Sequence, residues 1–212
     1  MLDKARYIVV EGPIGAGKTS LARRLAEHLK APQLLEKPEE NPFLQRFYQD
    51  MPRYALQTQL SFLFQRLDLL RETAQADLFD KKLVSDFLFE KDDLFAALNL
   101  ADDEYRLYRQ VYESLAIQAP VPDLVIYLQA DPETLMERVR RRDLDTERRV
   151  NEEYLARIAK RYARFFYQYD AAPVFTVNAD SLNPVDEEAD FKLLVDRLNA
   201  MRGYREFFGY AS

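Results

Sequence analysis

The residues from Gly12 to Thr19 have the composition and spacing of a phosphate-binding loop. They read Gly12-Pro13-Ile14-Gly15-Ala16-Gly17-Lys18-Thr19, and Ser20 follows them. The chain has only five glycines, so three of them within six positions indicate a strict backbone requirement. In such a loop, backbone amides and the N-terminus of the next helix surround phosphates, the lysine reaches the transferred end, and the hydroxyl ligates Mg²⁺. The sequence therefore predicts an ATP site with Thr19 as a metal ligand, built from Gly12, Gly15, Ala16, Gly17, Lys18, Thr19 and Ser20.

Two carboxylates are placed where they could complete such a site. Glu36 ends the second predicted strand, and Asp86 follows the third. In a parallel sheet these strand ends lie on the same rim as the phosphate loop. Glu36 could there accept a proton from a substrate hydroxyl as it attacks the γ-phosphate, and Asp86 fits a carboxylate associated with magnesium. Ordinary polar strand ends are the alternative for both residues.

An arginine-rich stretch, residues 138–150, predicts a lid. Arg138 and Arg142 are four residues apart and share one face of a helix. A lid of this kind would close over a triphosphate, neutralise charge on the moving phosphoryl group and exclude water. The alternative is a solvated basic face that pairs with the neighbouring Asp and Glu residues.

The elements that must position these residues alternate between short apolar strands and helices. The predicted strands cover residues 6–11, 33–36, 82–85, 124–128 and 174–177. The longest predicted helix covers 53–78, and it is apolar over so wide an arc that we expect it to be buried on two sides. With no hairpin signal, the pattern predicts an α/β fold with a five-stranded parallel sheet flanked by helices. No linker divides the chain, so residues 1–212 are expected to form one domain that contains the lid. The aromatic stretch 203–210 should dock back on that domain, with an oligomer contact as the alternative.

Composition narrows the classes of function. The chain has 212 residues, a net charge of −6 and no cysteine. These numbers exclude disulfides and thiolate chemistry, and they argue against a broad nucleic-acid-binding face. No signal-peptide pattern or apolar run of membrane-spanning length is present. We therefore expect a cytoplasmic protein that acts on a small molecule, without nucleic-acid or membrane partners.

The motifs resemble those of the deoxyribonucleoside kinase family, in particular its bacterial deoxyadenosine/deoxyguanosine kinase branch. The resemblance covers nearly the whole chain. It rests on the phosphate loop, on Glu36-Lys37-Pro38-Glu39-Glu40-Asn41-Pro42-Phe43-Leu44 with Phe47-Tyr48, on Gln57 and Arg66, on Pro122-Asp123-Leu124-Val125-Ile126-Tyr127-Leu128, and on Arg138, Arg142, Glu147 and Tyr154-Leu155. It implies a P-loop kinase fold and an ATP- and Mg²⁺-dependent kinase of deoxyribonucleosides, with purines favoured, that acts in nucleotide salvage as a homodimer.

The resemblance also implies roles for individual residues. Glu36 would be the general base on the sugar 5′-hydroxyl, while Tyr48 and Glu147 would hold the 3′-hydroxyl. Gln57 would hydrogen-bond the edge of the base. From the lid, Arg138 and Arg142 would grip phosphates, so that Glu36, Lys18 and Arg142 form the catalytic set and Asp86 lies beside substrate and metal.

Two departures from the family pattern bear on the mechanism. The arginine expected after the third strand is absent, because Phe87 follows Asp86, and Leu144 replaces a third lid arginine. An arginine at such a site contributes several orders of magnitude in rate. Either another cation, Arg140, Arg141, Arg148 or Lys91, takes over this charge, or the chain phosphorylates a different acceptor or binds nucleotide without catalysis.

Overall fold

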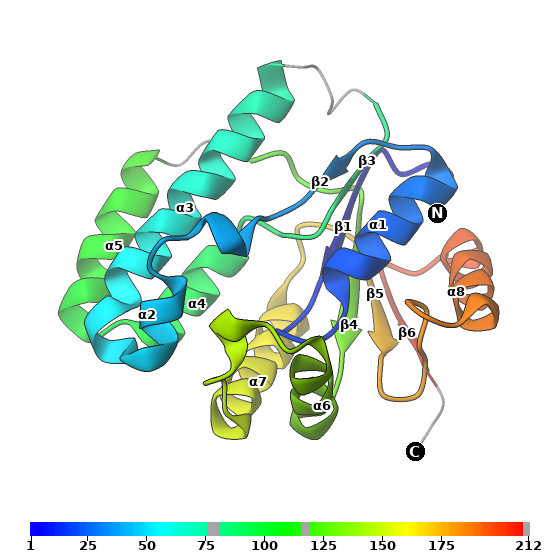
Figure 1. The fold of residues 1–212 in the computed structure, drawn as a ribbon. Helices are drawn as coiled ribbons and strands as arrows, with labels where there is room; N and C mark the ends of the chain where they lie inside the picture. The colour runs from blue at the N-terminus through cyan, green and yellow to red at the C-terminus, as the bar shows by residue number, and fades with distance from the viewer. Residues whose placement is uncertain (76–80, 116–118, 210–212) are drawn as a thin grey trace.

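The fold is organised around a six-stranded parallel sheet (Figure 1). The structure is a computed structural model, and it describes residues 1–75, 81–115 and 119–209. The strand order is β2-β3-β1-β4-β5-β6. The strands are β1 (Tyr7–Glu11), β2 (Gln33–Leu34), β3 (Leu83–Ser85), β4 (Leu124–Gln129), β5 (Val174–Asn178) and β6 (Arg205–Phe208). All five predicted strands are present, and the continuous apolar sequences of β1 and β4 reflect burial on both faces.

The sixth strand corrects the predicted count of five. β6 pairs in parallel with β5, from Val174 opposite Arg205 to Val177 opposite Phe208. It arises from the aromatic C-terminal stretch, which therefore docks back on the domain as predicted, although Tyr210 lies outside the described residues. The strand escaped prediction because it is a short edge strand: it carries Arg205 and Glu206, and its residues alternate between exposed and half-buried.

Helices cover both faces of the sheet. They are α1 (Lys18–Leu29), α2 (Leu44–Gln49), α3 (Met51–Gln75), α4 (Lys91–Asn99), α5 (Asp102–Leu115), α6 (Pro132–Arg142), α7 (Glu152–Gln168) and α8 (Glu188–Ala200). In Figure 1, α1 and α8 lie on one side of the sheet, and α3, α4 and α7 lie on the other. None of the described helices combines the length and the apolar character needed to cross a membrane.

The long helix α3 is buried on several sides, which explains its wide apolar arc. It packs against α2, α4 and α5, and Leu63, Leu67 and Leu70 are almost fully buried. Residues 76–78 of the predicted helix lie outside the described residues. Through this packing α3 forms one wall beyond the edge of the sheet.

The carboxyl ends of the parallel strands converge on one edge of the sheet. β1 leads into the phosphate loop, β2 leads to Glu36, and β3 leads to Asp86. Because β3 pairs with both β1 and β2, these three segments are neighbours. The fold therefore brings together residues that lie far apart in sequence, at the position where open α/β sheets bind ligands.

Candidate active site

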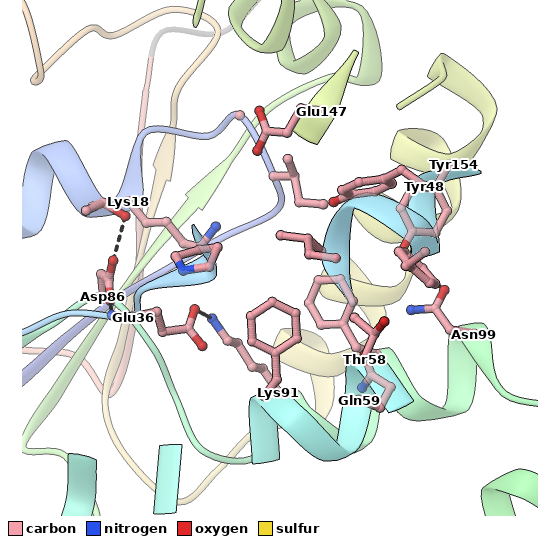
Figure 2. A pocket seen from close by; sticks show the side chains of 18 of the residues that line it. Lys18, Glu36, Tyr48, Thr58, Gln59, Asp86, Lys91, Asn99, Glu147 and Tyr154 are labelled. Carbon is pink, nitrogen blue, oxygen red and sulfur yellow. Dashed lines mark hydrogen bonds and ion pairs between the residues drawn. The ribbon is translucent and has the colours of Figure 1, made fainter. Parts of the chain in front are cut away.

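A single cavity of about 160 Å³ extends from the phosphate loop to the wall formed by α3 and α4. Figure 2 shows its side chains converging from several elements around Glu36 and Lys91. Its lining includes most of the predicted site: Gly15, Gly17, Lys18, Thr19, Ser20, Glu36, Tyr48, Asp86, Arg142 and Glu147. A second hollow, on the other side of the loop, is lined by Gly15, Ala16, Gly17, Ser20, Arg138, Arg141 and Arg142 together with residues 182–186.

The phosphate loop has the backbone conformation that its glycines predict. Gly15 and Gly17 have φ angles of 86° and 94°, in the left-handed region that a side chain disfavours. A Cβ atom on Gly15 would lie only 2.7 Å from the carbonyl oxygen of Leu135. Gly12, by contrast, lines neither cavity: its amide donates to Glu11 Oε1 at 2.8 Å behind the loop.

Lys18 projects from the start of α1 into the cavity. Its Nζ donates to the carbonyl of Pro13 at 3.4 Å. Burial lowers the pKa of Lys18, and the nearby charge of Lys91 lowers it further. The ammonium groups of the half-buried Lys18 and the buried Lys91 therefore repel each other, and Glu11, Glu36 and Asp86 offset part of this repulsion.

Thr19 and Asp86 form a pair that fits a magnesium ion carried by a phosphate ligand. Thr19 Oγ1 donates to Asp86 Oδ2 at 2.5 Å, while Asp86 Oδ1 accepts from the amide of Glu36 at 2.8 Å. Mg²⁺ typically takes one or two protein oxygens and completes its shell with phosphates and water. Among the described residues no group of three or more His, Cys, Asp or Glu side chains is placed to hold a metal ion, so such an ion would depend on its phosphate ligand. Ser85 is turned away, with its hydroxyl bonded to the carbonyl of Phe87.

Glu36 is held between two cations. Its Oε1 accepts from Arg66 Nε at 2.6 Å, and its Oε2 accepts from Lys91 Nζ at 2.6 Å. Burial alone would raise the pKa of Glu36, but Arg66 and then Lys91 lower it to about 2. The carboxylate is therefore ionised at neutral pH and fixed in orientation, facing the cavity.

The opposite wall of the cavity carries amides and aromatic rings. Gln59 lines it from α3, and Asn99 lines it from the end of α4, where its Oδ1 accepts from Tyr154 Oη at 3.2 Å. Phe62 and Phe95 supply apolar surface beside them. This combination suits a flat heteroaromatic ring with polar edges.

Gln57 is not part of this wall, which corrects the sequence-based expectation. Gln57 is exposed, whereas Gln59 is only 4% exposed and lines the cavity. Residues two positions apart on an α-helix point about 200° away from each other. An error of two residues in the register therefore exchanges the buried and exposed sides of α3. The overlooked signal was Gln59, Arg66 and Thr73, three polar residues seven apart that are all buried.

Arg66 and Asp92 close the base of the cavity. Arg66, on α3, pairs with Asp92, on α4, as well as with Glu36. Burial raises the pKa of Asp92 to about 6, in spite of Arg66, which divides its charge between two carboxylates. The pairing links the two helices directly behind Glu36.

The predicted lid residues separate into two groups. Arg142 and Glu147 form a bidentate ion pair at the mouth of the main cavity. Tyr48 lies close enough to Glu147 for the carboxylate to raise the pKa of the phenol, after the larger effect of burial. Arg138 faces the second hollow, where it donates to the carbonyl of Ala179 at 2.6 Å.

Of the four cations considered as replacements for the absent arginine, Lys91 alone lines the main cavity. Arg141 pairs with Asp186 and lines the second hollow. Arg148 pairs with Asp143 and Asp145 on the surface, and Arg140 is exposed.

Glu11 is a buried acidic residue whose importance the sequence did not reveal. It ends β1 at 0% exposure and accepts hydrogen bonds from the amides of Gly12 and Leu88 and from the hydroxyl of Tyr162. Its Oε2 also lies 3.6 Å from Lys91 Nζ. A carboxylate that ends an otherwise apolar strand immediately before a phosphate loop was the available signal.

A phosphate loop that faces a fixed carboxylate across a lined cavity, at the carboxyl edge of a parallel sheet, defines a P-loop phosphotransferase. The family model "Deoxynucleoside kinase" matches residues 8–201, and the chain belongs to this family. It is therefore a deoxynucleoside kinase, a phosphotransferase.

Similar proteins agree with this assignment. The chain is 32% identical over 198 residues to a deoxyguanosine kinase of Bacillus subtilis, covering 90% of this chain and 95% of that protein. It is 33% identical over 192 residues to a deoxyadenosine kinase of Lactobacillus acidophilus, covering 84% and 87%. A deoxyadenosine/deoxycytidine kinase of B. subtilis is 26% identical over 207 residues, covering 93% of each chain.

Solved structures show the same fold. A deoxyadenosine kinase from M. mycoides with bound dCTP superposes with a TM-score of 0.77 at 25% identity, covering 92% of this chain and all of that one. The same enzyme with the products dCMP and dCDP gives a TM-score of 0.80 at 26% identity, with the same coverage.

Proposed function

We propose that the chain transfers the γ-phosphate of ATP, with Mg²⁺, to the 5′-hydroxyl of a purine deoxyribonucleoside. One observation carries the proposal: a single cavity joins the phosphate-loop residues Lys18 and Thr19 to Glu36 and continues to Gln59 and Asn99. A donor phosphate, an acceptor hydroxyl and a base would each meet a suitable group along this path.

Each residue at the reacting end has a chemical role. Glu36 accepts the proton of the 5′-hydroxyl as its oxygen attacks the γ-phosphorus and the bond to the β-phosphate oxygen breaks. Lys18 and Arg142 donate N–H groups to the phosphate oxygens on which charge develops. Thr19 and Asp86 would hold Mg²⁺, which supplies neutralising charge when it is bound.

The proposed nucleoside contacts follow the cavity away from Glu36. Tyr48 and Glu147 would bind the 3′-hydroxyl near the mouth, and Gln59 would read the edge of the base in place of Gln57. Two relatives, a deoxyguanosine kinase and a deoxyadenosine kinase, support the purine preference. Deoxycytidine is the relevant competitor, because another relative is a deoxyadenosine/deoxycytidine kinase.

A coupled phosphorylation assay tests the proposal. Purified protein with ATP and Mg²⁺ should phosphorylate deoxyguanosine or deoxyadenosine with a kcat/KM at least tenfold above that for deoxycytidine, thymidine or the ribonucleosides. Lys18→Ala should abolish turnover without loss of folded structure, which excludes a contaminating kinase. Faster turnover of deoxycytidine or thymidine would contradict the purine assignment, and product from another acceptor alone would contradict the substrate class.

We also propose that the chain forms a homodimer through the surface of α3 and α5. These helices pack side by side, and they present Phe64 and Leu107 at 46% and 49% exposure. Light scattering should give twice the chain mass, and the double variant Phe64→Glu/Leu107→Glu should give the chain mass. A monomeric wild-type protein at micromolar concentration would contradict this proposal.

A further inference from the structure

Lys91 is placed unusually for a lysine. It is the first residue of α4, and its whole side chain is buried, at 3% exposure, with Nζ lining the cavity. A buried ammonium group is costly unless charges and hydrogen bonds satisfy it. Its surroundings should therefore account for all three of its N–H donors.

The described protein groups account for only part of that requirement. Lys91 Nζ makes one hydrogen bond within the described residues, to Glu36 Oε2 at 2.6 Å. Glu11 Oε2, at 3.6 Å, neutralises charge but lies beyond hydrogen-bonding distance. An ammonium group has three donors, so two of them lack an acceptor in the described chain and can bond to a ligand in the cavity.

The chemistry of the missing acceptor follows from the charges around it. Lys18 approaches the same region from the phosphate loop, and the charge of Lys91 opposes that of Lys18. Figure 2 shows both lysines extending toward the space beside Glu36. Both lysines feel the charge of Glu36, yet within the described residues Lys18 Nζ donates only to the carbonyl of Pro13, so it too keeps donors for a ligand. In this cavity the anion that passes between the loop and Glu36 is the phosphoryl group.

We propose that Lys91 is a catalytic residue that bridges Glu36 and the transferred phosphoryl group. This proposal rests on the proposed function. In the transfer step, the acceptor O–H bond breaks and its proton passes to Glu36, while the acceptor O–P bond forms. The P–O bond to the leaving nucleoside diphosphate breaks, and its electron pair stays on the diphosphate oxygen. Lys91 remains protonated throughout, and its free N–H groups bond to the equatorial phosphoryl oxygens, where charge collects.

The decisive variant is Lys91→Met, which retains length and apolar bulk but removes the charge. We expect kcat to fall by about 100- to 1000-fold, as for the loss of one oxyanion donor. The KM values for ATP and nucleoside should change by less than about threefold, because the lost contact belongs to the transition state. Lys91→Arg, which restores the charge, should have a kcat at least tenfold above that of Lys91→Met. Lys37→Met is the matched control: Lys37 is adjacent to Glu36 in sequence but is exposed and paired with Glu40, so its kcat should match the wild type.

Calorimetry provides a readout independent of turnover. In a complex with ADP and a deoxynucleoside, aluminium fluoride mimics the phosphoryl group during transfer. Its affinity should fall with Lys91→Met in parallel with kcat, while the affinities for ADP alone and nucleoside alone stay within threefold. If Lys91→Met does not fold, Lys91→Gln, whose amide can still donate to Glu36, should show the same loss.

The outcomes separate the two proposals. If the wild-type protein phosphorylates deoxynucleosides and the Lys91 variants keep the same kcat and the same affinity for the analogue, the role of Lys91 is overturned. The proposed function would still stand. Equal weakening of analogue, ADP and nucleoside binding would overturn it as well, because Lys91 would then act only as a structural ion pair. A wild-type protein that phosphorylates no deoxynucleoside would overturn both.

Discussion

Glu36→Gln keeps the size of the side chain but removes its charge and its capacity to accept a proton. The carboxylate has a pKa of about 2, so it is ionised across the neutral range and available as a base. Loss of a positioned base lowers kcat by at least about 100-fold, which corresponds to about 2.7 kcal/mol of transition-state stabilisation. Because Glu36 contacts the 5′-hydroxyl rather than the base, KM for the nucleoside should change much less than kcat.

The same substitution should also reduce stability, and the assay must allow for this. Arg66 and Lys91 each lose a charged partner at 2.6 Å. Removing one side of a buried ion pair costs about 3–5 kcal/mol, and the amide oxygen of glutamine retains part of one hydrogen bond. We therefore expect the lower end of that range, with a decrease of about 6–12 °C in Tm for a domain of this size.

Single-turnover phosphorylation at 15 °C, with the folded fraction checked by circular dichroism, separates the two effects. Glu36→Asp serves as the control, because it retains a charge and a base but shortens the side chain. Its kcat should lie between those of the wild type and Glu36→Gln. A folded Glu36→Gln protein with wild-type kcat would refute the assignment of Glu36 as the base.

Three further predictions follow from the same geometry. Gln59→Leu should lower kcat/KM for the nucleoside by about 10- to 100-fold, because contacts to the base are lost. Gln57→Leu, on the exposed side of α3, should change kcat/KM less than twofold. The reverse result in steady-state kinetics would show that Gln57, not Gln59, contacts the base. Asp86→Asn should raise the Mg²⁺ concentration for half-maximal rate at least tenfold in a metal titration, and an unchanged value would exclude Asp86 from the metal site. The ionised Glu36 should add about 3 kcal/mol to the free energy of unfolding above its ordinary pKa of 4.5, and this contribution should be lost as the pH falls toward about 2. Acid unfolding of Glu36→Gln should lack this component. An identical pH profile in both proteins would contradict the ion pairing.

The fold could be predicted where the sequence is locally unambiguous. The strand before the phosphate loop is a continuous apolar run, and the left-handed φ angles at Gly15 and Gly17 explain why glycine is needed there. Glu36 and Asp86 could be placed on one rim because parallel strands end on the same edge. The edge strand β6 gave no such signal, because one side of it has no partner in the sheet and its side chains are mixed in polarity.

The acceptor side of the site could be predicted only in part, because its residues come from helices. On α3, a shift of two positions exchanges the buried and exposed sides, so Gln57 and Gln59 could not be distinguished by composition alone. Lys91 was recognisable only as one of several cations, since nothing local indicates that α4 turns its first residue toward Glu36. The ion pair between Arg66 and Asp92 likewise depends on how α3 packs against α4.

The distribution of charge in the cavity explains why the metal is expected to matter as much as the lysines. In the cavity and directly behind it, three cations, Lys18, Arg66 and Lys91, stand against four carboxylates, Glu11, Glu36, Asp86 and Asp92. Their net charge is minus one when all are ionised, and the ion pair of Arg142 and Glu147 at the mouth does not change it. Arg66 is paired with two of these carboxylates, which offset its charge. A triphosphate entering without a metal would therefore add negative charge to a site that already has an excess of it. Mg²⁺ held by Thr19 and Asp86 would cancel two of the added negative charges, and Lys18 and Lys91 would then offset the charge on the phosphoryl group during transfer.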